Sequence, residues 1–130
     1  MRNPAELTYI PLVPNFFWTT TVDSFRIGTS DTFADKTYAA YKTPNMTSAI
    51  LDTGTTLIYV PSSAYATFVA TLMKNITYDL STGYLLGPCD ITQYQSVFLY
   101  INGNYFEVTP DNYISNQNTG VVGECLVGFM

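Results

Sequence analysis

One aspartate in this chain has neighbours that suit acid–base chemistry. Asp52 opens an Asp-Thr-Gly-Thr-Thr run at residues 52–56, with apolar runs at 49–51 and 57–60 on either side. These flanks predict a strand that enters a turn and a strand that leaves it. Gly54 allows the turn to be tight and brings its backbone N–H close to a neighbour. A carboxyl group between two buried strands is expected to have a perturbed pKa, as catalytic acids and bases have.

The same run also fits a purely structural turn. Asp and Thr side chains bond to nearby backbone groups, so a bare Asp-Thr-Gly is an ordinary turn signal. Its flanks distinguish this one, because surface turns seldom have Ile-Leu before them and Leu-Ile-Tyr-Val after them. The flanks therefore favour a catalytic carboxyl group at Asp52. Hydrogen bonding by Thr53 and Thr55 suits either interpretation.

Other segments carry a resemblance that covers nearly the whole chain. They are Leu-Thr-Tyr-Ile-Pro at 7–11, Phe-Trp at 17–18 followed by Val-Asp-Ser at 22–24, Val-Phe-Leu-Tyr-Ile-Asn-Gly at 97–103, and Cys-Leu-Val-Gly-Phe-Met at 125–130. With the Asp52 run, they resemble in order and spacing the C-terminal lobe of the pepsin family of aspartic proteases. The resemblance implies that residues 1–130 form one partial domain, mainly β, of the six-stranded barrel or sandwich type with one or two short helices.

The resemblance also implies roles for single residues. Asp52 would be the second of two catalytic aspartates that share a proton and activate water for attack on a peptide bond. The Gly54 N–H and the Thr55 hydroxyl would bond to its oxygens. Thr53 would brace the turn of the neighbouring lobe, and Thr56 would line the substrate cleft. The substrate would be a peptide or protein, and no cofactor is implied.

Two parts of the family pattern are expected outside this chain. One is the N-terminal lobe, with the first catalytic aspartate and the flap; the other is a hydrophobic-hydrophobic-Gly motif after Met130. The chain is therefore predicted to be a fragment without useful peptidase activity alone. Two alternatives stay open: a homodimeric protease of the retroviral type, in which each chain brings one Asp52, and a non-catalytic peptide-binding module.

The two cysteines bear on the compartment. Free buried thiols are common in cytosolic proteins, whereas the resemblance implies a disulfide between Cys89 and Cys125. A disulfide points to an oxidising compartment, and we expect a secreted or a lysosomal or vacuolar protein. Glycosylation sequons at Asn45 and Asn75 would be usable there.

Composition excludes several classes of function. The 130 residues fit one domain with a real core. The net charge of −5 argues against nucleic-acid binding. The absence of His excludes Ser-His and Cys-His catalysis and most zinc sites, so no metal is expected. No apolar run is long enough to span a membrane, and no signal peptide is visible.

The hydrophobic pattern predicts the elements around the turn. Trp18 and Tyr59 are assigned to the core, and an apolar stripe through Phe68 predicts a helix that begins at Pro61. Predicted strands cover 7–13, 16–27, 48–51, 57–60 and 121–130; a hairpin covers 96–108 with an Asn-Gly turn, and a helical turn covers 110–114.

Overall fold

A computed structural model describes residues 8–14, 16–28, 48–72, 77–79, 81–116 and 119–130. The two sequons at Asn45 and Asn75 lie outside these residues, so their use stays a prediction. Within the described part the chain is mainly β, with antiparallel sheets and two short α-helices. This confirms the predicted fold class.

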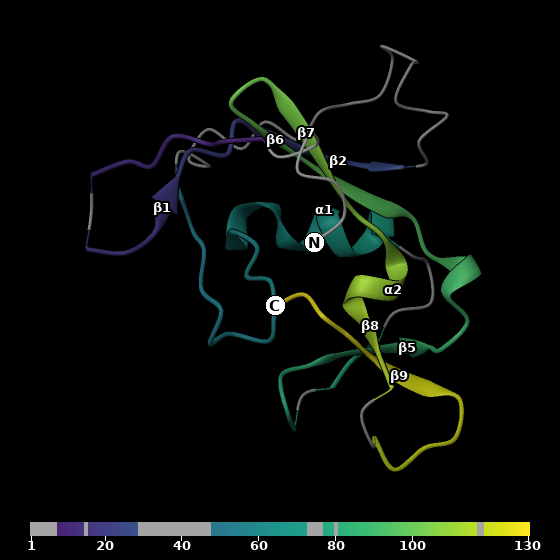
Figure 1. Ribbon diagram of the computed structural model, residues 1–130. Coiled ribbons are helices and arrows are strands. Elements are labelled where there is room, and N and C mark those ends of the chain that lie inside the picture. The colour runs from purple at the N-terminus through teal and green to yellow at the C-terminus, as the bar shows by residue number, and fades with distance from the viewer. Residues whose placement is uncertain (1–7, 15, 29–47, 73–76, 80, 117–118) are drawn as a thin grey trace.

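Among the described residues, the strands fall into three antiparallel sheets, most of whose strands are labelled in Figure 1. One sheet pairs β1 with β3, the second has the order β2-β6-β7, and the third has the order β4-β5-β9-β8. The bounds are β1 Thr19–Thr20, β2 Ser24–Gly28, β3 Ala49–Ile50, β4 Thr77–Tyr78, β5 Leu85–Pro88, β6 Ser96–Ile101, β7 Asn104–Val108, β8 Ile114–Ser115 and β9 Glu124–Val127; the helices are α1 Ser62–Leu72, α2 Pro110–Tyr113 and the 3-10 turn η3 Ile91–Gln93.

Helix α1 supplies the centre of the core. Pro61 precedes it, as expected for a helix start, and the side chains of Ala64, Phe68 and Leu72 are buried one turn apart. The Phe68 ring meets Phe25 of β2 and Phe129, with centroids 5.3 and 4.7 Å apart. Figure 1 shows α1 at the centre of the molecule, and its apolar face joins the sheets of β2 and β9 into one core.

The hairpin of β6 and β7 forms as its sequence predicts. Asn102 and Gly103 have φ values of 47° and 78°, which the two central positions of its tight turn require. The helical turn α2 follows, and its Tyr113 hydroxyl donates to the Gln95 carbonyl across 2.6 Å. This bond ties α2 to the residue before β6, and the backbone bond from Gly128 N–H to the Tyr113 carbonyl (2.7 Å) holds α2 beside the end of β9.

Three predicted strands differ from the structure. Residues 16–27 form two short strands, because β1 pairs with β3 whereas β2 pairs with β6 in another sheet. Residues 8–13 contribute only a bridge from Val13 to Thr19, since Pro11 and Pro14 remove two backbone donors. Residues 57–60 make one isolated parallel bridge, from Ile58 to Phe129, and do not form a regular β-strand.

Candidate active site

Backbone hydrogen bonds fix the Asp52 turn at both ends. On the incoming side β3 pairs with β1, and Leu51 N–H donates to the Trp18 carbonyl across 2.8 Å. On the outgoing side, Ile58 N–H donates to the Gly128 carbonyl, and Met130 N–H donates to the Ile58 carbonyl, at 2.9 and 3.0 Å. The turn therefore bridges the small sheet and the end of β9 without belonging to either.

Two donors hold the Asp52 carboxylate. The Gly54 N–H donates to Oδ1 at 2.8 Å, and the Thr55 hydroxyl donates to Oδ2 at 2.5 Å. A Cβ on residue 54 would lie 3.2 Å from the same Oδ1, so glycine allows this close approach. These are the two contacts that the resemblance implies, and each carboxylate oxygen accepts one of them.

The same contacts shift the pKa of Asp52. The Thr55 hydroxyl and then the Gly54 N–H lower this pKa below its ordinary value, because both stabilise the charged form. These contacts therefore favour the ionised form of Asp52 in this chain. An ionised carboxylate suits the member of an aspartate pair that takes a proton from water.

The expected burial of Asp52 is wrong for this chain. Its carboxylate is exposed, and so are its apolar neighbours: Leu51 is 54% exposed and Tyr59 is 66% exposed. Trp18, assigned to the core from its sequence context, is 70% exposed. The physical reason is that the described residues place no surface against this side of the turn, so desolvation contributes little to the pKa.

The side chains of Thr56 and Thr53 have different surroundings. Thr56 lines a pocket of about 260 Å³ with Ile58 and Leu126. Thr53 is exposed, and its side chain has no hydrogen bond to any described residue, so its bracing role stays a prediction. Tyr84, Asn112 and Ser115 also line the pocket; they come from three separate segments and carried no local signal in the sequence.

The disulfide between Cys89 and Cys125 is present. The two sulfur atoms are bonded, and the bridge joins the end of β5 to β9, whose backbones already pair at Gly87 and Cys125. The predicted disulfide is thereby confirmed. It fastens the strand pair whose end carries Gly128, the acceptor for the outgoing side of the Asp52 turn.

A second aspartate has similar local geometry. The Asp79 carboxylate accepts a hydrogen bond from the Ser81 N–H at 2.9 Å. It also accepts from the hydroxyls of Ser81 and Thr82, both at 2.7 Å. These donors lower its pKa to about 2. Hydrogen bonding within the turn therefore does not by itself distinguish a catalytic aspartate from a structural one; Asp52 also has the exposed apolar neighbours Leu51 and Tyr59.

The described residues hold neither a metal-ligand cluster nor a membrane-spanning helix. Among them, no cluster of three or more metal-ligating side chains is found. No helix within the same ranges has the length and apolar character needed to cross a bilayer.

Comparison with known proteins places these features in a family. The family described as eukaryotic aspartyl protease matches residues 4–130. Cathepsin D of Mus musculus is 29% identical over 128 residues, which cover 97% of this chain and 28% of the relative. Pepsin A of Gallus gallus is 28% identical over 121 residues, covering 93% and 28%. Gastricsin of Mus musculus is 27% identical over 126 residues, covering 95% and 28%.

The chain thus spans about 28% of the length of these curated relatives. The match extends through the Asp52 turn, the disulfide and the Gly-Phe-Met end. The chain belongs to the eukaryotic aspartyl protease family.

Proposed function

We propose that this chain is the C-terminal lobe of a two-lobed aspartic endopeptidase and that Asp52 supplies one of its two catalytic carboxylates. The observation that carries the proposal is the Asp52 carboxylate, held by the Gly54 N–H and the Thr55 hydroxyl and exposed among apolar neighbours. An isolated structural turn has no need of such neighbours, whereas a half-site has an interface to bury.

The chemistry needs a second carboxyl group from outside these residues, because the sequence holds a single Asp-Thr-Gly. When two carboxyl groups lie side by side, the repulsion between their charges keeps both from ionising, so one of them retains its proton. The ionised member removes a proton from a bound water, whose oxygen attacks the scissile carbonyl carbon. The protonated member donates a hydrogen bond to the carbonyl oxygen. The substrate is a peptide or protein, and this lobe alone is inactive.

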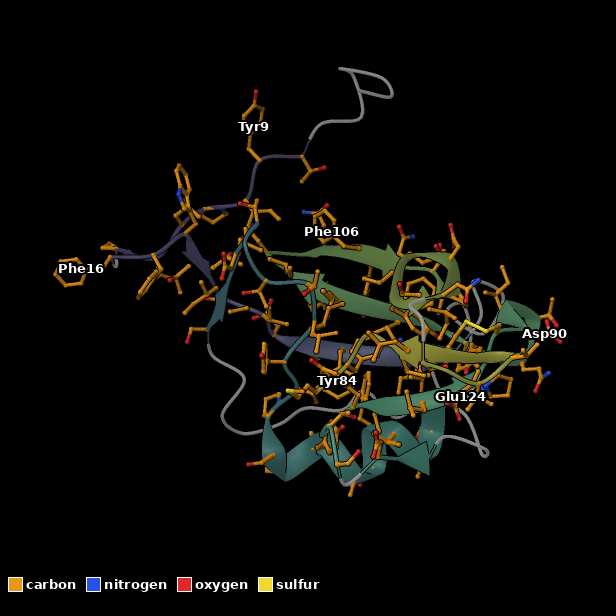
Figure 2. The ribbon with its side chains drawn as sticks, turned by 90° about the horizontal axis from the view of Figure 1, so that it is seen from below. Tyr9, Phe16, Tyr84, Asp90, Phe106 and Glu124 are labelled. Atoms are coloured by element: carbon orange, nitrogen blue, oxygen red, sulfur yellow. A yellow bond between two sulfur atoms is a disulfide. The ribbon has the colours of Figure 1, made fainter. Side chains whose placement is uncertain are left out.

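The exposed apolar side chains are assigned to the interface with the second lobe. Figure 2 shows Phe16 projecting from one extreme of the molecule, well away from the labelled Asp90 and Glu124 at the other end. Trp18, Leu51 and Tyr59 lie on the segments that flank the turn, and all three are exposed. A second lobe that covers them would also desolvate Asp52 and supply the turn that Thr53 braces.

The disulfide supports an oxidising compartment for this protease. A secreted or a lysosomal or vacuolar location is consistent with it, and the sequons at Asn45 and Asn75 would be glycosylated there. Mass spectrometry of the protein from its natural source, before and after removal of N-linked glycans, tests both points together.

Substitution of the aspartate in the two-lobed protein tests the proposal. We expect Asp52→Asn to abolish cleavage of an acid-denatured protein and Asp79→Asn to retain it, although both carboxylates have similar local contacts. Cleavage by the Asp52→Asn protein at the unmodified rate would refute the proposal and favour a non-catalytic module.

A second candidate uses the same exposed surface. If two copies of this chain bury their flanks against one another, each contributes one Asp52, as in a homodimeric protease. Sedimentation of the isolated chain separates the two: a monomer supports the two-lobed enzyme, whereas a tight dimer with pepstatin-sensitive activity supports the homodimer.

A further inference from the structure

Gly128 links the Asp52 turn to a buried part of the molecule. Its carbonyl accepts from the Ile58 N–H at 2.9 Å, and its N–H donates to the Tyr113 carbonyl at 2.7 Å. Both backbone polar groups of this glycine are therefore used, one towards the Asp52 turn and the other towards α2. A displacement of Tyr113 would consequently displace the carbonyl that holds Ile58.

Ile58 is the first fixed point after the turn. Residues 56 and 57 make no backbone hydrogen bond to any other described element, so Ile58 is the first residue after Thr55 whose backbone is tied to one. Thr55 in turn supplies the hydroxyl that donates to Asp52 Oδ2. The position of Ile58 therefore limits where the Thr55 hydroxyl lies relative to the carboxylate.

The contact between Gly128 and α2 requires a glycine. A Cβ on residue 128 would lie 2.9 Å from the Tyr113 carbonyl oxygen, and the next two nearest atoms also belong to the Tyr113 backbone. A side chain at this position would therefore push the two segments apart. The Phe129 N–H donates to the Val127 carbonyl at 2.8 Å, so the chain bends sharply at Gly128 as it leaves β9. This bend brings residues 128–130 beside residues 58–60.

Tyr113 is held on several sides. Its side chain is buried, and its hydroxyl donates to the Gln95 carbonyl at 2.6 Å. Its ring packs on the rings of Phe129 and Tyr94, with centroids 4.9 and 6.1 Å apart. Figure 1 shows α2 continuing into β8, which pairs with β9. These contacts fix the Tyr113 carbonyl to which Gly128 bonds.

We propose that Tyr113 is a positioning residue for the Asp52 turn and that it acts through Gly128. The tyrosine fixes the backbone of Gly128, Gly128 fixes Ile58, and Ile58 limits the position of the Thr55 hydroxyl beside the carboxylate. The inference rests on the proposed function where it concerns catalysis, but not where it concerns the hydrogen bonds of the carboxylate.

Two tyrosine variants separate positioning from stability. Tyr113→Phe removes the hydroxyl bond to the Gln95 carbonyl, whereas Tyr94→Phe, the matched control, removes a similar bond to the Pro88 carbonyl at 2.8 Å. Both side chains are buried, so the two variants should lower the free energy of unfolding by similar amounts. Of the two tyrosines, only Tyr113 bonds to Gly128 among the described residues.

The first readout is an NMR titration of the Asp52 carboxyl carbon in the 130-residue chain. In Tyr113→Phe we expect the pKa of Asp52 to rise towards its ordinary value, because the Thr55 hydroxyl that lowers it would be held less closely. In Tyr94→Phe we expect the pKa of the unmodified chain. The second readout is cleavage by the two-lobed protein. Tyr113→Phe should lower kcat about tenfold with KM changed by less than about twofold, and Tyr94→Phe should change neither.

The proposal is overturned if the two tyrosine variants give the same Asp52 pKa or the same kcat. Either result would mean that the hydroxyl of Tyr113 contributes to stability alone, as that of Tyr94 does.

Two glycine variants test the link itself. Gly128→Ala places a Cβ against the Tyr113 carbonyl and should raise the Asp52 pKa more than Tyr113→Phe does, because it displaces the backbone that both segments share. Gly87→Ala is the matched control, since its Cβ would meet the Tyr94 hydroxyl in the same sheet but outside the bend. The same Asp52 pKa in both glycine variants would contradict the link.

The outcome is separable from that of the proposed function. A raised Asp52 pKa in Tyr113→Phe, together with cleavage that survives Asp52→Asn, would retain the positioning of the carboxylate and reject its catalytic role. Loss of cleavage in Asp52→Asn, with equal Asp52 pKa and equal kcat in the two tyrosine variants, would retain the catalytic role and reject Tyr113 as a positioning residue.

Discussion

Two regions of this chain use apolar residues in opposite ways. The core region, formed by α1 with β2, β6 and β9, buries its side chains; Phe68 is 1% exposed and contacts two other phenylalanine rings. The Asp52 region, residues 16–20 and 49–60, leaves Trp18, Leu51 and Tyr59 exposed. The first region finds its partners within the chain, whereas the second presents its apolar surface around a carboxylate.

The difference between these two regions is the basis for proposing that the Asp52 region is half of a site. Large apolar side chains that remain exposed beside an ordered polar turn indicate a binding surface. The turn itself is already organised, because the Gly54 and Thr55 contacts need no second lobe. The hydrogen bonds that fix the Asp52 carboxylate are therefore made within this chain. We propose that a second lobe covers the carboxylate and supplies its desolvation.

The largest effect is expected in the core region. Phe68→Ala should lower the free energy of unfolding by about 3–5 kcal/mol, because it removes a buried ring and leaves a cavity. Urea unfolding of the isolated chain, followed by circular dichroism, measures this change. A loss below 1 kcal/mol, on the order of a surface substitution, would break the contrast between the two regions.

Removal of the disulfide should have the next largest effect. The bridge closes a loop of sequence separation 36, and in the chain-entropy model such a loop contributes about 3–4 kcal/mol. The variant with Cys89→Ser and Cys125→Ser should unfold at correspondingly lower urea concentration than the oxidised chain. Equal midpoints would show that pairing of β5 with β9 suffices without the bridge.

In the isolated chain, removal of a large apolar side chain should destabilise the Asp52 region much less than the core region. Trp18→Ala should change the unfolding free energy of the isolated chain by less than about 0.5 kcal/mol, since the side chain is 70% exposed. In the two-lobed protein the same change should be strongly destabilising. Equal effects in both proteins would show that no second surface covers Trp18.

A smaller effect is expected on acid stability at Asp79. Its folded pKa of about 2 is below the ordinary value of 3.8, so its contribution is present above pH 3.8 and is lost as the pH falls towards 2. Asp79→Asn should therefore flatten the fall in melting temperature across that window. If melting temperature falls with pH equally steeply in the unmodified and the Asp79→Asn proteins, the contacts of the Asp79 carboxylate would be formed equally in the folded and the unfolded chain.

The sequence predicted the elements whose signals are local. The stripe through Phe68 identified α1, and the Asn102-Gly103 pair identified the hairpin, because each signal concerns residues that are neighbours in the structure. The contacts of Asp52 with Gly54 and Thr55 are also local. Family resemblance, rather than spacing, indicated the bridge between Cys89 and Cys125.

What the sequence did not predict depends on distant partners. The run at 16–27 is uniformly strand-like, yet its halves join different sheets, because the available partner strands lie in different places. Burial of Trp18 and Tyr59 was wrong because an apolar residue does not reveal whether its partner belongs to the same chain. The pocket that joins Thr56 to Tyr84 and Ser115 likewise exists only after folding.

Titration of the Asp52 carboxyl carbon by NMR, in the isolated chain and in the two-lobed protein, tests the central claim most directly. In the isolated chain we expect a single step below the ordinary aspartate pKa, which Thr55→Val should raise because it removes the first of the two donors. In the two-lobed protein the signal should follow two steps that belong to a coupled pair, one of them raised. An identical single step in both proteins would contradict the account, since Asp52 would then have no partner carboxyl group.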